Sequence, residues 1–198
     1  MIKMKVHDMF SLKGKVAVVT GGSSGLGITF ARALAEVGAN IVLAATRLDK
    51  LNEVGDDLSR LGVKVKPVQC DVSNQDQVQS LVDETIRTFG RLDVVVNNAG
   101  VAAMSPATDI SVEDWNRVVS INLTGTFLCA RTAARQMMKR GGGKIVNISS
   151  IYGAVGDVFP ASPYYATKGA VINLTRDLAV EWAPFKINVN AHRARVLP

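Results

Sequence analysis

The chain has 198 residues, 47% of them hydrophobic and 20% charged, a balance that is typical of one globular domain and excludes disordered, collagen-like and disulfide-rich small proteins. Lysine and arginine number 23 against 17 acidic residues, a net charge of +6, but the basic residues are dispersed, so we expect no nucleic-acid partner. Cys70 and Cys129 have no C-x-x-C pattern and no histidine nearby, so we expect no metal site and no disulfide. No apolar run approaches the ~18 residues of a membrane span, so we expect a cytoplasmic protein without a membrane partner.

Short apolar runs recur along the chain, and most are continuous instead of alternating with polar residues. Such runs are typical of strands that are buried on both faces of a parallel sheet. They cover residues 16–19, 41–45, 63–68, 92–96, 144–148 and 187–191.

Helical patterns separate these runs, and the first three end at a glycine, which is a signal for the C-terminus of a helix. The expected helices cover residues 26–37, 48–61, 78–89, 112–139 and 164–182.

Two helix starts carry a capping pattern. Ser73 lies three residues before Asp76, and Ser111 lies three residues before Asp114. An N-cap hydroxyl followed at this spacing by an acid resembles a capping box, so we expect both serines to cap a helix.

The elements alternate as strand and helix five times and close with a sixth strand. Because parallel crossovers are right-handed, this order predicts an α/β protein with a doubly wound, Rossmann-like parallel sheet and helices on both faces. No linker divides the chain, so we expect a single domain over residues 12–191, preceded by an N-terminal arm over residues 1–11 and followed by a tail over residues 192–198.

A glycine-rich loop follows the first strand directly, with the sequence Thr-Gly-Gly-Ser-Ser-Gly-Leu-Gly over residues 20–27. Glycines at the start of a helix let backbone N–H groups approach a pyrophosphate. The loop does not match the Rossmann pattern G-x-G-x-x-G, because Phe30 stands where the third glycine would be. No Gly-Lys-Ser/Thr follows, which argues against an NTPase P-loop. The alternative is a tight turn without a ligand.

Two further motifs follow in order, Asn97-Asn98-Ala99-Gly100 after the fourth strand and Tyr164-x-x-x-Lys168 in the last helix. Together with T-G-x-x-x-G-x-G, they resemble the short-chain dehydrogenase/reductase family over about residues 12–191. The segments around Ser150 and Tyr164 look similar to those of gluconate 5-dehydrogenase and 3-oxoacyl-carrier-protein reductase relatives.

This resemblance implies an NAD(P)(H)-dependent oxidoreductase that interconverts a secondary alcohol and a ketone of a small hydroxy or keto substrate by hydride transfer. It also implies a homodimer or homotetramer in the full-length form, built through the helices over residues 115–138 and 164–182. The residues that it assigns to the dinucleotide are Thr20, Gly21, Ser23, Ser24, Gly25, Leu26, Gly27, Arg47, Asp71, Val72, Asn98, Ala99, Gly100, Tyr164 and Lys168.

The end of the second strand bears on the choice of cofactor. It reads Ala-Ala-Thr-Arg over residues 44–47, without an acid for the adenosine ribose. The guanidinium of Arg47 suits a 2′-phosphate, so we expect NADP(H) in preference to NAD(H). Ser24 argues the other way, because many NADP-using relatives carry a base there. Both assignments to the dinucleotide have an alternative: Arg47 is simply solvated, and Asp71 only shapes a turn.

Tyr164 and Lys168 are four residues apart, so they project from one face of a helix. The resemblance makes Tyr164 the general acid and base, with a neighbouring ammonium that favours the phenolate. It makes Ser150 the hydroxyl that holds the substrate oxygen, with Ser149 as the alternative. Tyr165 competes with Tyr164 but points about 100° around the helix, toward packing or substrate.

Asn122 matches the family asparagine that completes a proton relay behind the lysine. The alternative is a buried asparagine that satisfies backbone groups. The loop over residues 151–163 offers Tyr152, Val155, Val158 and Phe159 as a partly apolar wall for the substrate.

After Ala191, relatives normally continue with a Pro-Gly turn, a substrate lid, a helix and a seventh strand, whereas this sequence reads His-Arg-Ala-Arg-Val-Leu-Pro over residues 192–198. One choice of codons with a single base removed would restore Ala-Ile-Ala-Pro-Gly-Phe-Phe, so we hypothesise a frameshift. The lid and the last strand are then expected to be missing, and the alternative function is a dinucleotide-binding remnant with weak or no turnover.

Overall fold

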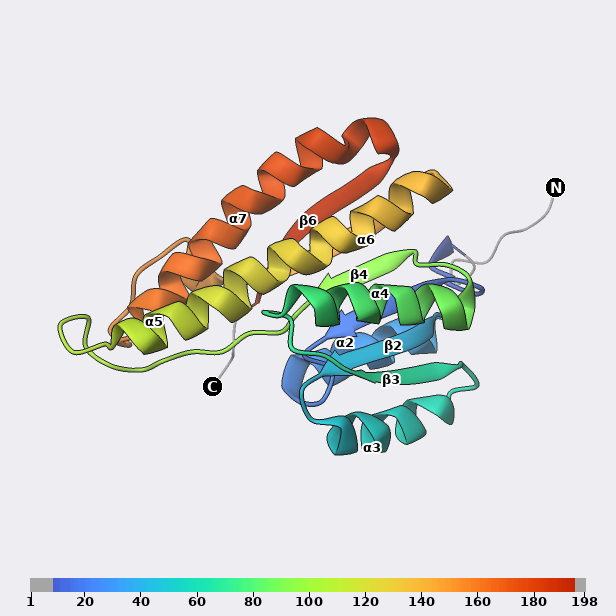
Figure 1. Cartoon of the computed structure of the whole chain (residues 1–198), viewed down its shortest axis with the longest axis horizontal. Helices are drawn as coiled ribbons and strands as arrows, with labels where there is room; N and C mark the ends of the chain where they lie inside the picture. Colours follow the sequence, from blue (N-terminus) through green and yellow to red (C-terminus); the bar gives the residue numbers. More distant parts are fainter. Residues whose placement is uncertain (1–8, 195–198) are drawn as a thin grey trace.

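Six strands form one parallel sheet in the order β3-β2-β1-β4-β5-β6 (Figure 1), which confirms the predicted α/β architecture. The computed structural model describes residues 9–194, so most of the predicted arm and the end of the predicted tail lie outside the described residues. In chain order the elements are β1 (Val16–Thr20), α2 (Gly25–Glu36), β2 (Asn40–Ala45), α3 (Leu48–Ser59), β3 (Val65–Gln69), α4 (Gln75–Phe89), β4 (Val94–Asn97), α5 (Val112–Val119), η1 (Ser120–Gly125), α6 (Thr126–Arg140), β5 (Gly143–Ser150), η2 (Ile151–Gly153), α7 (Ser162–Trp182), η3 (Ala183–Phe185) and β6 (Ile187–Ala194).

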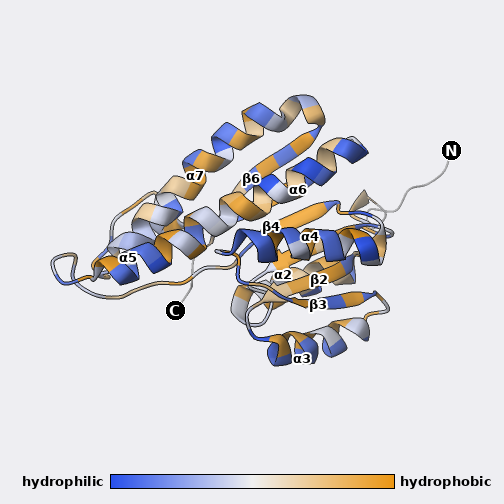
Figure 2. Cartoon of the chain, in the orientation of Figure 1, coloured by the Kyte–Doolittle hydropathy of each residue, from blue (hydrophilic) through white to orange (hydrophobic). Residues whose placement is uncertain are grey.

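The sheet separates two hydrophobic cores, because successive side chains of a strand point to opposite faces. Val18 of β1 belongs to the core beneath α4, α6 and α7, together with Leu178. Its neighbour Val19 belongs to the core beneath α2 and α3, together with Leu51. In Figure 2 the central strand β4 is coloured as hydrophobic, whereas α4 carries many hydrophilic residues. The helices therefore cover both faces of the sheet.

Burial on both faces holds for the central strands but not for the edges. Every residue of β1 and β4 is buried. In β6, by contrast, Ile187 and Val189 are buried while Asn188 and Asn190 are exposed. The prediction was wrong there because α6 and α7 cover the face of β6 that carries Ile187 and Val189, while Asn188 and Asn190 on the other face are exposed.

β6 also extends to Ala194, three residues further than the sequence pattern indicated. Residues His192 to Ala194 pair in parallel with residues Ile148 to Ser150 of β5. The first part of the predicted tail is thus a strand. It forms because it pairs with β5, since its own residues have no apolar pattern.

The cap of α4 differs from the prediction by one residue. The side chain of Asn74, not that of Ser73, accepts the backbone N–H of Asp76. The Ser73 hydroxyl instead donates to Oδ1 of Asp71 at 2.7 Å. The competing carboxylate therefore removes Ser73 from the helix terminus, and Asn74 takes its place.

The helix predicted over residues 112–139 begins at its expected cap, Ser111, but it is not a continuous α-helix. Between α5 and α6 its hydrogen bonding widens into the π-helical turn η1. A Cβ built on Gly125 would lie 2.7 Å from Cγ2 of Val72, so glycine permits the close approach of this turn to the segment after β3. Such turns are frequent at functional sites.

The strand order reverses between β1 and β4, which are neighbours in the sheet although β2 and β3 lie between them in the chain. Open α/β sheets bind ligands beyond the carboxyl ends of their strands at such a point. Here the loops that follow Thr20, Asn97 and Ser150 meet.

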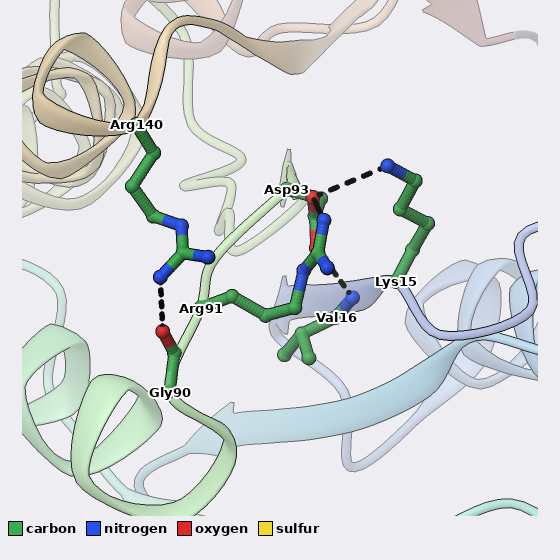
Figure 3. Close-up of polar contacts among 6 residues, drawn as sticks. All are labelled: Lys15, Val16, Gly90, Arg91, Asp93 and Arg140. Atoms are coloured by element: carbon green, nitrogen blue, oxygen red, sulfur yellow. Dashed lines mark hydrogen bonds and ion pairs between the residues drawn. The ribbon is translucent and has the colours of Figure 1, made fainter.

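At the amino ends of the strands, Asp93 connects neighbouring segments of the sheet (Figure 3). Its carboxylate accepts the backbone N–H of Val16 at 2.9 Å and the Nε–H of Arg91 at 2.7 Å, and Lys15 lies 3.7 Å away. Burial opposes ionisation, but these donors and charges outweigh it and hold the pKa of Asp93 below its ordinary value. Charged groups thus connect the strands at their amino ends, and the candidate site lies at their carboxyl ends.

Candidate active site

The loop over residues 20–27, called the glycine loop below, has a shape that only glycine accommodates at two points. Gly21 and Gly25 have φ values of +66° and +54°, in the left-handed region that glycine enters without strain. A Cβ on Gly27 would lie 2.1 Å from the carbonyl oxygen of Gly21, while a Cβ on Gly25 would meet nothing within 4 Å. The loop is closed on its inner side and open on its outer side.

The first turn of α2 faces this open side. Its N-cap, Ser24, makes no side-chain capping bond, and Leu26 is 45% exposed. Backbone N–H groups at a helix N-terminus carry partial positive charge and suit an anion. The glycine loop can therefore receive a phosphate group.

Asn98 ties the glycine loop to the end of β4. Its side-chain Nδ2 donates to the carbonyl oxygens of Thr20 and Gly21 at 3.0 and 3.3 Å. In return, Oγ1 of Thr20 accepts the backbone N–H groups of Asn98 and Ala99 at 3.0 and 3.1 Å. Two motifs 78 residues apart thus form one rigid unit.

The preceding residue, Asn97, is structural. It is 3% exposed, and its Nδ2 donates to Oδ1 of Asn147 at 2.8 Å, while Asn147 donates to Oγ1 of Thr175 at 2.9 Å. This chain of bonds fixes β4, β5 and α7 relative to one another.

The end of β5 presents the two candidate serines differently. The hydroxyl of Ser149 donates to the carbonyl oxygen of Lys168 at 2.8 Å and so fastens β5 to α7. The hydroxyl oxygen of Ser150 accepts the backbone N–H of Tyr152 at 3.2 Å, which leaves its proton available to a ligand. The geometry favours Ser150 as the hydroxyl that contacts a substrate.

Lys168 is almost fully enclosed, at 5% exposure. Its ammonium donates to the carbonyl oxygen of Ile148 at 2.7 Å and lies 5.5 Å from the ring centroid of Tyr164. Burial lowers the pKa of Lys168 to about 8. The ammonium is therefore held beside the phenol ring, as the spacing of four predicts.

Tyr165 is in a different environment. Its hydroxyl oxygen is buried and has no hydrogen-bond partner among the described residues. Desolvation, with a contribution from the charge of Asp157, raises the pKa of Tyr165. Both effects make it a poor proton carrier, which favours Tyr164 for that role.

Asn122 lies in η1 and is 1% exposed. Its Oδ1 accepts the backbone N–H of Val101 at 2.8 Å, and its Nδ2 donates to the carbonyl oxygen of Val101 at 2.9 Å and to Oγ1 of Thr167 at 3.2 Å. A Cβ on Gly100 would lie 3.3 Å from Oδ1 of Asn122 and 3.5 Å from Nζ of Lys168. The side chain thus satisfies backbone groups next to the lysine.

One cavity of about 880 Å³ is bordered by part of these groups, whereas Asn97 and Asn122 lie behind its lining. It runs from the glycine loop, past the ends of β4 and β5, to the first turn of α7. Its lining consists of Leu26, Asn98, Gly100, Val101, Ala102, Met104, Ile148, Ser149, Ser150, Ile151, Tyr152, Asp157, Phe159, Ala161, Tyr164, Tyr165, Lys168 and Ala194.

Of the residues expected at the dinucleotide, the cavity is lined by Leu26, Asn98, Gly100, Tyr164 and Lys168. The others lie outside the lining: Thr20, Gly21, Ser23, Ser24, Gly25, Gly27, Arg47, Asp71, Val72 and Ala99. Among these, Arg47, Asp71 and Val72 belong neither to the glycine loop nor to the segment after β4. Arg47 is exposed at the start of α3, just past the end of β2. Asp71 shapes a turn, since its Oδ1 accepts the backbone N–H of Ser73 at 2.9 Å, and the side chain of Val72 is buried in the core. Their positions border the same edge of the sheet without reaching the cavity.

Of the expected apolar wall, Tyr152 and Phe159 line the cavity, whereas Val155 and Val158 do not and are 56% and 89% exposed. Sequence reasoning missed Met104 and Asp157, which do line it. For Met104 the available signal was its position in the loop after β4. Asp157 had no local signal, because a loop folding over the site places it there.

Within residues 9–194, none of the helices combines the length and the apolar character that crossing a bilayer requires. In the same range there is no group of three or more His, Cys, Asp or Glu residues that could hold a metal ion. Both cysteines are free and buried.

Comparison with known proteins agrees with the geometry. The family model for short chain dehydrogenases matches residues 15–194. A cis-4-hydroxycyclohexanecarboxylate dehydrogenase from Sinomonas cyclohexanicum is 44% identical over 89% of this chain and 71% of its own length. A gluconate 5-dehydrogenase from Gluconobacter oxydans is 38% identical over 94% of this chain and 73% of its own length.

Solved structures agree as well. A short-chain type dehydrogenase/reductase from Mycobacterium marinum superposes with a TM-score of 0.92 at 39% identity, covering 94% of this chain and 74% of its own. Relatives also differ in the cofactor that their names give: a glycerol dehydrogenase from Listeria innocua is NAD-dependent (36% identity, 92% of this chain, 70% of its own), and a mannitol dehydrogenase from Alternaria alternata is NADP-dependent (38% identity, 91% and 70%). On this combination of fold, motifs and matched sequence, the chain belongs to the short-chain dehydrogenase family.

Proposed function

We propose that this protein is an NAD(P)(H)-dependent oxidoreductase that interconverts a secondary alcohol and a ketone, with Tyr164 as the general acid and base. One observation carries the proposal: Ser150, Tyr164 and Lys168 border the same cavity as Leu26 and Asn98 at the glycine loop. A proton-transfer group and an anion-binding loop are thus joined by one continuous space.

The residues present fit a dinucleotide. The glycine loop would hold the pyrophosphate through the backbone N–H groups of residues 23–27, since the outer side of Gly25 is open and the α2 N-terminus is free of a side-chain cap. Ala99 and Gly100 would back the adjoining ribose, and Tyr164 and Lys168 would lie at the nicotinamide end. When bound, the nicotinamide supplies or accepts the hydride.

The side chains of this protein would then handle the proton. The hydroxyl of Ser150 donates to the substrate oxygen and orients it, and the phenol of Tyr164 gives or takes the hydroxyl proton. With a pKa of about 8, Lys168 is mostly charged at neutral pH, and its ammonium favours the phenolate. Asn122 acts as a positioning residue, since its bonds to Val101 and Thr167 hold the loop after β4 against α7.

Replacing Tyr164 by phenylalanine tests the proposal. We expect Tyr164→Phe to lower kcat by about 10²- to 10⁴-fold, because it removes the proposed general acid and base. Turnover is measured at the absorbance of the reduced nicotinamide with a panel of secondary alcohols, ketones and sugar acids.

Cofactor binding serves as the control, since Tyr164→Phe should keep the rise in Tm that NADPH or NADH gives to the parent protein. A parent protein that binds dinucleotide but turns over no substrate would support the non-enzymatic alternative. Full activity of the variant would contradict the role of Tyr164.

We further propose NADP(H) as the preferred cofactor. Arg47 is exposed past the end of β2, and its guanidinium has no hydrogen-bond or ion-pair partner within residues 9–194. A free guanidinium can hold a 2′-phosphate with two hydrogen bonds. Arg47→Gln should therefore raise the Kd for NADPH about tenfold, as expected for loss of a charge-assisted bond, and leave the Kd for NADH unchanged. Equal weakening of both cofactors, measured by titration of nicotinamide fluorescence, would count against a 2′-phosphate contact.

A further inference from the structure

The end of the cavity beyond Tyr164 is bordered by aromatic rings. The rings of Tyr152 and Tyr165 lie 5.0 Å apart, centroid to centroid, and those of Tyr152 and Phe159 lie 6.4 Å apart. We call these three residues the aromatic wall. The helix α7, the turn η2 and the following loop each supply one ring, so the wall exists only in the folded chain.

The remaining lining on this side is also apolar. Val101, Ala102 and Met104 come from the loop after β4, and Ile151 and Ala161 come from the two ends of the segment between β5 and α7. Each polar group of a ligand that enters here loses water, and it must find a partner or bear the cost of desolvation.

At the substrate end of the cavity, the charges of the lining do not suit an anionic substrate. Within the described lining only Asp157 and Lys168 are charged. The ammonium of Lys168 is 5% exposed and is bound to the carbonyl oxygen of Ile148, so it is not available to a distant carboxylate. Asp157 is negative and exposed in the loop after η2. A substrate carboxylate would therefore meet hydrocarbon and a like charge, with no cation to pair with.

Few hydrogen bonds are available to a polyol either. The hydroxyl of Tyr165 is buried away from solvent, so this ring presents hydrocarbon to the cavity. Under the proposed function, the hydroxyls of Ser150 and Tyr164 bind the reacting oxygen of the substrate. Most of the remaining wall presents carbon atoms, which form no hydrogen bonds with a substrate. Asp157 offers a carboxylate acceptor on this side, but several substrate hydroxyls would still be left without partners.

We propose that the substrate is an uncharged secondary alcohol or ketone with a mainly hydrocarbon skeleton, and not a sugar acid or a polyol. This inference rests on the proposed function, which assigns the glycine-loop end of the cavity to the dinucleotide and the aromatic wall to the substrate. The negative charge of Asp157 and the uncharged side chain of Met104 decide between neutral and anionic substrates.

The first test compares matched substrates on the parent protein. Cyclohexanol and cis-4-hydroxycyclohexanecarboxylate share a ring and a hydroxyl and differ by one carboxylate, and xylitol and gluconate represent polyols and sugar acids. We expect kcat/KM for cyclohexanol to exceed that of each of the others by about tenfold or more, because the carboxylate and the extra hydroxyls are desolvated without partners. A value for gluconate, xylitol or the carboxylate equal to or above that for cyclohexanol would overturn the proposal.

The second test places a cation in the wall. Met104 is 66% exposed, so it can be replaced without disturbing the core. Met104→Lys should shift the ratio of kcat/KM for the ring carboxylate over cyclohexanol upward by about tenfold, whereas Met104→Gln, of similar length but neutral, should shift it far less. The proposal fails if both variants change the ratio equally.

Removing the acid gives an independent measurement. Asp157→Asn should raise the same ratio by about two- to fivefold, a modest effect because an exposed charge is screened by water. Asp177→Asn, an exposed acid of α7 outside the cavity lining, is the matched control and should leave the ratio unchanged. No change in Asp157→Asn would remove Asp157 from the specificity site.

A failure of the proposed function can be distinguished from a failure of this inference. If no substrate is turned over with either cofactor, the proposed function fails, and substrate preference is then measured as the rise in Tm of the NADP⁺-loaded protein with cyclohexanone or with gluconate. A rise with cyclohexanone alone supports an apolar binding site. A rise with gluconate, or none with millimolar cyclohexanone, overturns it.

Discussion

Lys168 is a charged side chain held out of water, with its ammonium on the carbonyl oxygen of Ile148 and 5.5 Å from the ring centroid of Tyr164. Its neutral form is favoured by burial, which brings its pKa down from 10.5 to about 8. Such a group costs stability at neutral pH. The fold retains it because the proposed chemistry needs a cation beside a phenol.

Lys168→Met should therefore stabilise the protein. A pKa lowered from 10.5 to about 8 corresponds to a cost of up to roughly 3 kcal/mol for the charged form. The variant also loses the hydrogen bond to Ile148, so the net gain in stability should be smaller than this cost. The lysine is charged in both states below pH 8, where the cost is complete, and neutral in both above pH 10.5, where it vanishes.

Urea unfolding of the parent and the variant between pH 7 and pH 10.5 measures this. The gain in unfolding free energy should shrink as the pH rises through that window. Lys139→Met, at an exposed position of α6, should give no such pH dependence. A gain for Lys168→Met that is constant with pH would contradict the argument.

At the scale of elements, Asp93 connects the amino ends of the strands. Its side chain accepts the N–H of Val16 at the start of β1, and its backbone carbonyl accepts the N–H of Lys144 in β5 at 2.9 Å. Arg91 pairs with the carboxylate, while Arg140 of α6 donates to the carbonyl oxygen of Gly90 nearby (Figure 3). One acid thus connects three strands.

Asp93→Asn should lower the free energy of unfolding at pH 7 by about 1–3 kcal/mol, because it removes the charge that Arg91 pairs with. The pKa of Asp93 lies below its ordinary value of 3.8 in the folded protein, so its stabilising effect is complete above that pH and is lost as the pH falls through the lowered folded pKa. The difference between parent and variant, from urea unfolding at pH 7, 4 and 3, should be largest at pH 7. A difference that grows on acidification would disprove the assignment.

For the molecule as a whole, the question is whether the two cores act together. Leu51 of α3 and Trp182 of α7 belong to the cores on opposite faces of the sheet. The central strands β1 and β2 contribute to both. Because these strands cannot separate from one core without exposing the other, we propose that residues 12–191 unfold as a single cooperative unit.

Leu51→Ala, at a fully buried position, should cost about 2–5 kcal/mol. With Trp115→Phe as background, Trp182 is the one tryptophan of the two in the chain that remains, and its fluorescence reports the opposite core. The urea midpoint from Trp182 fluorescence should fall by the same amount as that from far-UV circular dichroism. Separate midpoints would indicate two independently unfolding layers.

The strand and helix order, the glycine loop and the family were within reach of the sequence, because each is encoded locally. The runs that became β1 and β2 are apolar throughout, and Gly38, Gly62 and Gly90 mark helix ends in the left-handed region. The spacing of four between Tyr164 and Lys168 fixes their shared helix face without knowledge of the rest of the chain.

Only the tertiary structure decided the features that depend on residues far apart in the chain. The bond from Ser149 to Lys168 distinguishes it from Ser150, and the bonds from Asn122 to Val101 and Thr167 give the π-helical turn η1 its role. The exposure of Asn188 and Asn190 in β6, and the aromatic wall of the cavity, likewise arise from packing between separate elements. These outcomes rest on long-range contacts, which no local pattern of residues specifies.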